Sequence, residues 1–280
     1  MDYVKPNDVV NAIAIDGKTK ASLSIRDILI KAILSGAFLG FATTLAYTGS
    51  TQTGFDIVGA LIFPTGFVMI LILNLELVTG SFAMIPIAAL RKQTTFSRMF
   101  RNFTWAFIGN LLGSLLYAFL FSISVTKFGH VTDALIIDKI MMVAEAKTIN
   151  YKAYGSDGIN ILFVNAIRCN WMVTMGALMA FTSNSTIGKI AAMWIPVFIF
   201  FAQGFEHAVV NMFVIPMGML LGADISFTDW WLWNQIPVTI GNLLSGAFFT
   251  GLAFHLITKQ QSNEQQFKSP ARSKAVKYKI

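Results

Sequence analysis

Apolar residues dominate six stretches of the chain, and polar or charged residues gather between them. The stretches are residues 28–47, 58–90, 105–125, 159–182, 190–221 and 236–257. A helix rises ~1.5 Å per residue and a bilayer's hydrocarbon core is ~30 Å thick, so each stretch is long enough to cross a membrane. The apolar–polar alternation of a membrane β-barrel strand is absent. The pattern predicts an all-α polytopic membrane protein with six transmembrane helices.

Two of these stretches are too long, and polar residues interrupt both. As straight helices, residues 58–90 and 190–221 would each span about 50 Å. The first contains NLELVTGS at 74–81 and the second contains QGFEHAVVN at 203–211. Backbone can leave a helix at membrane depth only where protein or a water-filled cavity satisfies its freed polar groups. We therefore predict that the second and fifth helices are broken at these two motifs.

The two breaks belong to an internal repeat. Glu76 and Glu206 lie 130 residues apart, and each is followed ten residues later by a proline. The motifs IGNLLGSL (108–115) and IGNLLSGA (240–247) place Asn110 and Asn242 132 residues apart. Two markers at nearly one offset predict halves at residues 26–125 and 159–258. Three crossings per half make the second half inverted, and inverted repeats with broken helices are typical of transporters and channels.

The charges predict an orientation. With both termini in the cytoplasm, the cytoplasmic segments hold 16 lysines and arginines against five acids, a net charge of +11. The outer segments hold four lysines against seven acids, a net charge of −3. The positive-inside rule favours this arrangement in a cell membrane. It puts an amphipathic N-terminal segment (1–25) and a basic tail (259–280) in the cytoplasm, on either side of a transmembrane domain (26–258).

Composition narrows the class of function. The chain has 280 residues, of which 55% are hydrophobic and 12% charged, about half the charged fraction of a soluble domain. The net charge of +7 follows from the topology, so a basic pI does not indicate nucleic-acid binding. One cysteine and three histidines without an HExxH pattern leave no metal site, and there is no GxSxG motif. We predict no enzyme and no cofactor; a structural or signalling membrane protein is the alternative.

The motifs GFEHAVVNMF, IPMG and NLELVTG resemble those of the formate/nitrite transporter family. That family includes formate, nitrite and hydrosulfide channels, and the resemblance covers about residues 5–258. It implies an aquaporin-like protomer of six helices with the second and fifth broken. It also implies a homopentamer in which each protomer has its own pore through the lipid bilayer. The helix-two motif favours formate as the substrate, with nitrite and hydrosulfide as alternatives.

The resemblance also implies a set of pore residues. His207 corresponds to a central pore histidine, Thr79 to the threonine that faces it, and Asn170 to an asparagine of the fourth helix near the pore. A cytoplasm-side constriction is implied at Phe63, Phe67 and Phe200, and an outer narrowing at Leu77. After a shift of two residues, Lys152 corresponds to a lysine of the outer vestibule.

A central histidine suggests how a carboxylate could pass apolar narrowings. Stripping a carboxylate of water costs several kcal/mol, whereas a neutral acid crosses more easily. Histidine is the side chain suited to exchange a proton near neutral pH, so we predict that His207 does so. We expect Glu76 and Glu206 to be structural, accepting backbone N–H groups freed at the breaks. Arg168 departs from the family pattern; snorkelling, a subunit interface or a glutamate partner would each explain it.

Overall fold

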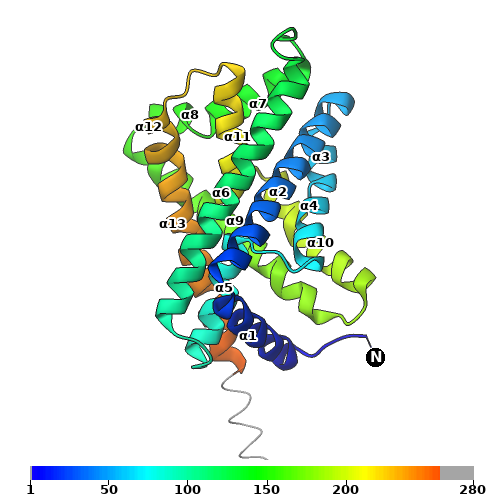
Figure 1. The fold of residues 1–280 in the computed structure, drawn as a ribbon, viewed down its shortest axis with the longest axis vertical. Coiled ribbons are helices and arrows are strands. Elements are labelled where there is room, and N and C mark those ends of the chain that lie inside the picture. Colours follow the sequence, from blue (N-terminus) through cyan, green and yellow to red (C-terminus); the bar gives the residue numbers. More distant parts are fainter. Residues whose placement is uncertain (1, 259–280) are drawn as a thin grey trace, which may run out of the picture.

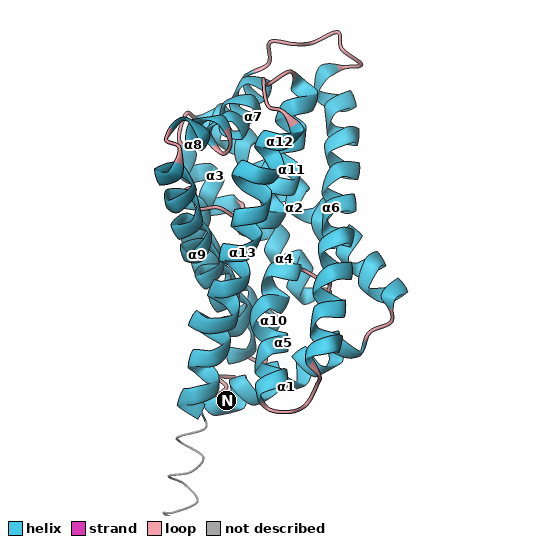
Figure 2. Cartoon of the chain, turned by 90° about the vertical axis from the view of Figure 1, so that its left-hand side faces the viewer, coloured by secondary structure: helices cyan, strands magenta, loops and turns pink. Residues whose placement is uncertain are grey.

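The computed structural model describes residues 2–258. These residues form helices that run along one long axis (Figures 1 and 2). Besides helices and turns, these residues contain one isolated bridge, between Tyr3 and Ser183. The prediction of an all-α protein is therefore confirmed. The predicted basic tail, residues 259–280, lies outside the described residues. We call the end that carries α1 (Pro6–Ser22) the α1 end, and the opposite end, which carries α7 (Leu135–Ala146), the α7 end (Figure 1).

Four helical stretches are long and apolar enough to cross a membrane. They are α2 (Ile25–Thr53), α6 (Phe96–Thr126), α9 (Ser156–Met179) with η1 (Ala180–Thr182), and a last run to Thr258 made of α12 (Phe227–Trp230), η2 (Trp231–Gln235), α13 (Ile236–Leu244) and η3 (Ser245–Leu252). At the start of α2 the Ser24 hydroxyl accepts a hydrogen bond from the backbone of Asp27, and Gly54 ends the helix with a φ of 76°. Only glycine adopts that left-handed conformation freely.

The two remaining apolar stretches are broken where the sequence predicts. One contains α3 (Asp56–Ile62), α4 (Pro64–Ile72) and α5 (Val78–Leu90); the other contains α10 (Thr186–Ala202) and α11 (Ala208–Leu221). Each break has a residue in the left-handed region, Asn74 with φ 50° and Gly204 with φ 65°. Each then ends in an extended residue that precedes a helix, Leu77 with φ −111° and His207 with φ −107°. The two breaks therefore share one backbone conformation.

Two further helices, α1 and α7, flank the broken ones at opposite ends of the molecule. Helix α1 packs against α5, and α7 packs against α11. Gly17 allows the first contact, because a Cβ there would collide with the carbonyl oxygen of Met84. Within the predicted amphipathic segment 1–25, residues Pro6–Ser22 form α1, and one face of this helix is buried. Helix α7 and the short α8 (Ile149–Ala153) lie in a segment for which the apolar pattern predicted no element.

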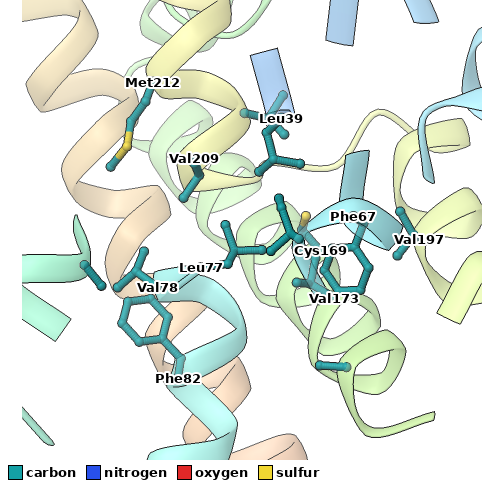
Figure 3. Close-up of a cluster of buried hydrophobic side chains, with 14 of the residues drawn as sticks. Leu39, Phe67, Leu77, Val78, Phe82, Cys169, Val173, Val197, Val209 and Met212 are labelled. Atoms are coloured by element: carbon teal, nitrogen blue, oxygen red, sulfur yellow. The ribbon is translucent and has the colours of Figure 1, made fainter. Parts of the chain in front are cut away.

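The centre of the molecule is filled by side chains from both halves. Figure 3 shows Leu77, Val78 and Phe82 of the first break and α5 beside Val209 and Met212 of α11. Cys169 and Val173 of α9, Phe67 of α4 and Leu39 of α2 complete this cluster (Figure 3). The ends of the two broken helices therefore meet inside the protein, shielded from the membrane by the long helices.

Candidate functional site

The two breaks bring Thr79 and His207 into contact. Thr79 lies in the first turn of α5, and His207 is the residue that precedes α11. The hydroxyl oxygen of Thr79 lies 2.9 Å from Nε2 of His207. Both side chains are buried, with exposed fractions of 0% and 2%. Residues 128 positions apart in the chain thus form one polar contact in an otherwise apolar centre.

The second ring nitrogen of His207 fixes its tautomer. Nδ1 accepts a hydrogen bond of 3.1 Å from the backbone N–H of Val210, so the ring caps the N-terminus of α11. Because that bond uses the lone pair of Nδ1, the hydrogen-bond network assigns the proton of the neutral ring to Nε2, which donates to the Thr79 hydroxyl oxygen. The hydroxyl hydrogen of Thr79 then remains for another acceptor. The pair therefore offers the Thr79 hydroxyl as a hydrogen-bond donor to an anion.

Asn170 supports this pair from α9. Its amide nitrogen donates to the carbonyl oxygens of Thr79, at 3.1 Å, and of Asn242, at 2.7 Å. Its side-chain oxygen is buried and has no hydrogen-bond partner among the described residues. The structure thus brings together the three residues predicted at the pore centre, Thr79, Asn170 and His207.

Two asparagines hold the breaks open with matching hydrogen bonds. Asn110 accepts from the N–H of Val78 at 3.0 Å and donates to the carbonyl oxygens of Glu76 and Ala32, both at 2.9 Å. Asn242 repeats the pattern: it accepts from Ala208 N–H at 2.9 Å and donates to the carbonyls of Glu206 (3.0 Å) and Ala166 (2.8 Å). Each side chain thereby satisfies backbone groups that the break removes from helical bonding.

The two glutamates take part in buried ion pairs. The carboxylate of Glu76 accepts from Lys20 at 2.7 Å and from Asn102 at 3.0 Å. The carboxylate of Glu206 accepts from Lys147 at 3.1 Å, from Asn211 at 2.7 Å and from Asn234 at 3.2 Å. This differs from the expectation that the carboxylates bind backbone N–H groups of the breaks. The asparagine amides take that place, and the carboxylates neutralise lysines instead.

The sequence prediction did not include the partners of the glutamates. Lys20 and Lys147 come from α1 and from the residue after α7, and Asn102 and Asn234 come from α6 and η2. The repeat in the sequence indicates these partners. The two lysines are 127 residues apart and the two asparagines 132 apart, close to the offset of the repeat. Extending the repeat search beyond the apolar stretches would have found them.

Two cavities approach the centre from opposite ends. The α7-end cavity has a volume of about 300 Å³, and its lining includes Asp56, Lys139, Glu206 and His207. Asp56 is exposed whereas Glu206 and His207 are buried, so Asp56 and Lys139 lie on its solvent side. Its wall also contains Tyr47, Lys147, Tyr151, Phe200 and Val210. The α1-end cavity, of about 160 Å³, is lined among others by Asp16, Lys20, Asn74, Phe181 and Lys189. Basic groups therefore line both approaches.

Aromatic rings pack beside His207. Phe63 packs on Phe200 with ring centroids 5.6 Å apart, and Phe200 stacks on His207 at the same distance. Phe67 is buried. Phe200 lines the α7-end cavity. If the α1 end faces the cytoplasm, the α7 end faces outwards, and this cavity position conflicts with the expected place of Phe200 in a cytoplasm-side constriction. Leu77 points into the central cluster (Figure 3).

Lys152 lies away from this site. Its ammonium forms an ion pair of 2.7 Å with Asp229, and its side chain is 50% exposed. Lys147, and not Lys152, is the lysine of this segment that lines the α7-end cavity.

Arg168 lies on an exposed side of α9, halfway along the helix. It donates to Asn165 at 3.4 Å and to Gln203 at 3.3 Å, and its guanidinium stands 4.1 Å from the ring centre of Phe205. No ion pair joins Arg168 to a glutamate in the described part of the chain. Its contacts are therefore with the break before α11.

Residues 7–256 match the sequence pattern of the formate/nitrite transporter family. The chain belongs to this family. A probable formate transporter of Methanothermobacter thermautotrophicus is 30% identical over 264 residues, which cover 90% of this chain and 96% of that protein. The formate channel BtFdhC of Bacillus thuringiensis is 29% identical over 270 residues, 94% of this chain and 99% of that one. Formate/nitrite transporters are membrane channels or transporters, and this chain is not an enzyme.

Solved structures of the same fold agree with the family assignment. An ion channel of the formate/nitrite transporter family superposes with a TM-score of 0.75 over 89% of this chain and 98% of that one, at 23% identity. A pentameric formate channel with formate bound superposes with a TM-score of 0.69 over 83% of this chain and 97% of that one, at 24% identity. The helical architecture described above is therefore that of a formate/nitrite channel.

Proposed function

We propose that the protein conducts small monovalent anions of weak acids, formate first, through a pore within each chain that passes beside the contact between Thr79 and His207. The observation that carries this proposal is the buried Thr79–His207 contact where the two helix breaks meet, reached by a cavity that contains His207. The similarity to a probable formate transporter and to a formate channel favours formate. Nitrite and hydrosulfide are the alternative substrates.

The proposed pore lies in a chain of six crossings arranged as two inverted repeats. The matched hydrogen bonds of Asn110 and Asn242 support this arrangement. So does the course of α5 and α11, which leave the centre towards α1 and towards α7 respectively. The charge distribution supports a cytoplasmic α1 end. The pentameric assembly of the formate channel that shares this fold supports a ring of five protomers.

The anion first loses water in a cavity that contains cationic groups. Lys147 lines the α7-end cavity next to Glu206, and Lys20 and Lys189 line the α1-end cavity. Lys147 and Lys20 are each paired with a glutamate, so they polarise the cavities without presenting a full positive charge. Such partial compensation lowers the cost of bringing in an anion without trapping it, which conduction requires.

At the centre, the anion meets the donors of Thr79 and His207. The hydroxyl hydrogen of Thr79 replaces water around one carboxylate oxygen, and Nε2–H joins it when it turns from the Thr79 oxygen to the anion. A proton transfer from Nε2 to the anion leaves a neutral ring only if Nδ1 has taken up a proton first. Protonation of Nδ1 breaks its hydrogen bond with Val210, because the new Nδ1 hydrogen and the backbone N–H hydrogen of Val210 would then point at each other. We propose that His207 exchanges protons with the anion by this loosening of the cap.

Flux through proteoliposomes tests the proposal. Wild-type protein should carry formate, nitrite and hydrosulfide faster than empty vesicles, and an imposed pH gradient should drive formate accumulation. A purely structural or signalling protein would give no flux above that of empty vesicles.

The variant His207→Asn separates proton exchange from hydrogen bonding. Asparagine is among the preferred residues at a helix N-cap, so the variant should fold, but it does not titrate. It should keep a formate current and lose gradient-driven accumulation. Accumulation equal to that of the wild type would refute proton exchange at His207 and leave it as a donor that solvates the anion.

A further inference from the structure

A second ion pair lies at the opening of the α7-end cavity. Nζ of Lys139, on α7, lies 2.7 Å from Oδ1 of Asp56, the first residue of α3. Both side chains line the cavity whose far end holds Glu206 and His207. Lys147 follows Lys139 by eight residues, which is about two helical turns. One segment therefore brings two ammonium groups into the same cavity.

The two partners of this pair are unequally exposed. The side chain of Lys139 is 18% exposed, whereas that of Asp56 is 76% exposed. Within the described residues, the cation paired with the Asp56 carboxylate is Lys139, and the Ser50 hydroxyl lowers the pKa of that carboxyl to a smaller extent. Glu206, by contrast, is 2% exposed and accepts from Lys147, Asn211 and Asn234. The Glu206 carboxylate is fixed, while the Asp56 carboxylate can leave Lys139 for water at little cost, as exposed ion pairs do.

The chemistry of the pair matches that of the proposed substrate. The side chain of aspartate ends in a carboxylate, which is also the whole binding group of formate. An ammonium group binds either carboxylate as a point charge. Unlike a guanidinium, it does not require a fixed orientation of the two carboxylate oxygens. A carboxylate that arrives from the α7 end meets Lys139 before it reaches Lys147.

We propose that Lys139 is the first binding point for the permeating anion and that Asp56 is a built-in competitor, which occupies Lys139 in the empty channel and is displaced by the incoming carboxylate. This inference rests on the proposed function. In this proposal Asp56 sets the apparent affinity for the anion and takes no part in the proton exchange at His207. A structural role, in which the pair only fastens α7 to α3, predicts a different result.

The chain contains a control of the same charge type for this pair, although there the aspartate is the less exposed partner, 10% against 50% for the lysine, and also binds Ser226. Lys152 and Asp229 also form an ion pair of 2.7 Å at the α7 end, but neither lines the cavity. Replacing Asp56 or Asp229 by asparagine removes the same charge from the same side of the protein. Any general effect of surface charge on the local anion concentration is common to both variants.

The test measures initial rates of formate uptake against formate concentration, in sealed vesicles with formate offered at the α7 end. For Asp56→Asn we expect a half-saturating concentration up to about fivefold lower, with an unchanged maximal rate; fivefold corresponds to about 1 kcal/mol, the upper value for an exposed pair. Lys139→Gln should raise the half-saturating concentration. Asp229→Asn should behave as the wild type. Size-exclusion chromatography in detergent verifies that each variant is folded.

Three results would overturn the inference. Equal half-saturating concentrations for Asp56→Asn and Asp229→Asn would reduce the effect to general surface charge. A lower maximal rate with unchanged half-saturation in Asp56→Asn would make the pair a structural fastening. A wild-type protein that carries no formate, nitrite or hydrosulfide would refute the proposed function, and the competitor with it. In the first two cases wild-type flux is intact, so the proposed function stands.

Discussion

Replacing Asn242 by alanine should destabilise the protein more than most single substitutions do. The side chain of Asn242 makes three buried hydrogen bonds to backbone groups, with Ala208 N–H, Glu206 C=O and Ala166 C=O. Its side chain is fully buried, and alanine leaves no group that could replace these bonds. The break before α11 would lose the side chain that joins it to α9.

The size of the loss follows from the groups left without a partner. The carbonyl of Ala166 lies within a helix and keeps its helical bond, so it counts little. The N–H of Ala208 and the carbonyl of Glu206 lie at the break, and an unsatisfied buried group costs ~1–3 kcal/mol. We expect a loss of about 3 kcal/mol, which corresponds to a fall in Tm of roughly 6–12 °C for a domain of this size.

Thermal unfolding of the detergent-solubilised protein measures this loss. Asn110→Ala should cost about the same, because Asn110 makes the equivalent three bonds at the other break. Asn160→Ala is the control: Asn160 is exposed on α9, and its replacement should change the stability by less than ~0.5 kcal/mol. A fall in Tm below about 2 °C for Asn242→Ala would show that the break is held by packing rather than by this side chain.

Three further predictions concern the site and its ion pairs. Phe200→Ala should widen the passage beside His207 and admit lactate, and an unchanged size limit in flux assays would remove Phe200 from the constriction. Lys20→Met should cost about 3–5 kcal/mol in thermal unfolding, because it leaves the carboxylate of Glu76 buried without its cation; the double variant with Glu76→Gln should recover part of that loss. Lys139 lowers the pKa of Asp56 below its usual value, so Asp56 stays ionised as pH falls from about 7 to about 5 and its pair with Lys139 is lost only as pH falls through that lowered pKa. The ratio of half-saturating concentrations between Asp56→Asn and wild type should therefore be the same at both ends of that range, and a ratio that changes would mean that Asp56 takes up a proton within it.

The sequence predicted those features that depend on the repeat and on hydropathy. Each apolar stretch corresponds to helix in the structure, and both breaks lie at the predicted motifs. The contact between Thr79 and His207 came from the resemblance to a family and not from the pattern alone. Its geometry depends on how two distant breaks meet, which no local pattern encodes.

The helices and partners outside the apolar stretches were not predicted, for a physical reason. Helix α7 is not long enough to cross a membrane, and it follows a polar segment, so hydropathy gives it no weight. Lys147 was missed because a lysine in such a segment normally faces water, and only the tertiary fold places it on Glu206. The nearby Lys152 has the same local character but pairs with Asp229. Choosing between the two lysines requires three-dimensional contacts.

The opposed helices α5 and α11 have a consequence for the electrical state of the cell. Both begin at the centre of the protein, at Val78 and at Ala208, and the N-terminus of a helix carries a partial positive charge. Two such ends meeting at mid-membrane form a barrier to sodium and potassium ions, while they attract anions. With the proposed function, a cell that opens this pore would pass the anion or its acid while its sodium and potassium gradients are kept. Reversal potentials measured under a potassium gradient should stay constant as that gradient is varied.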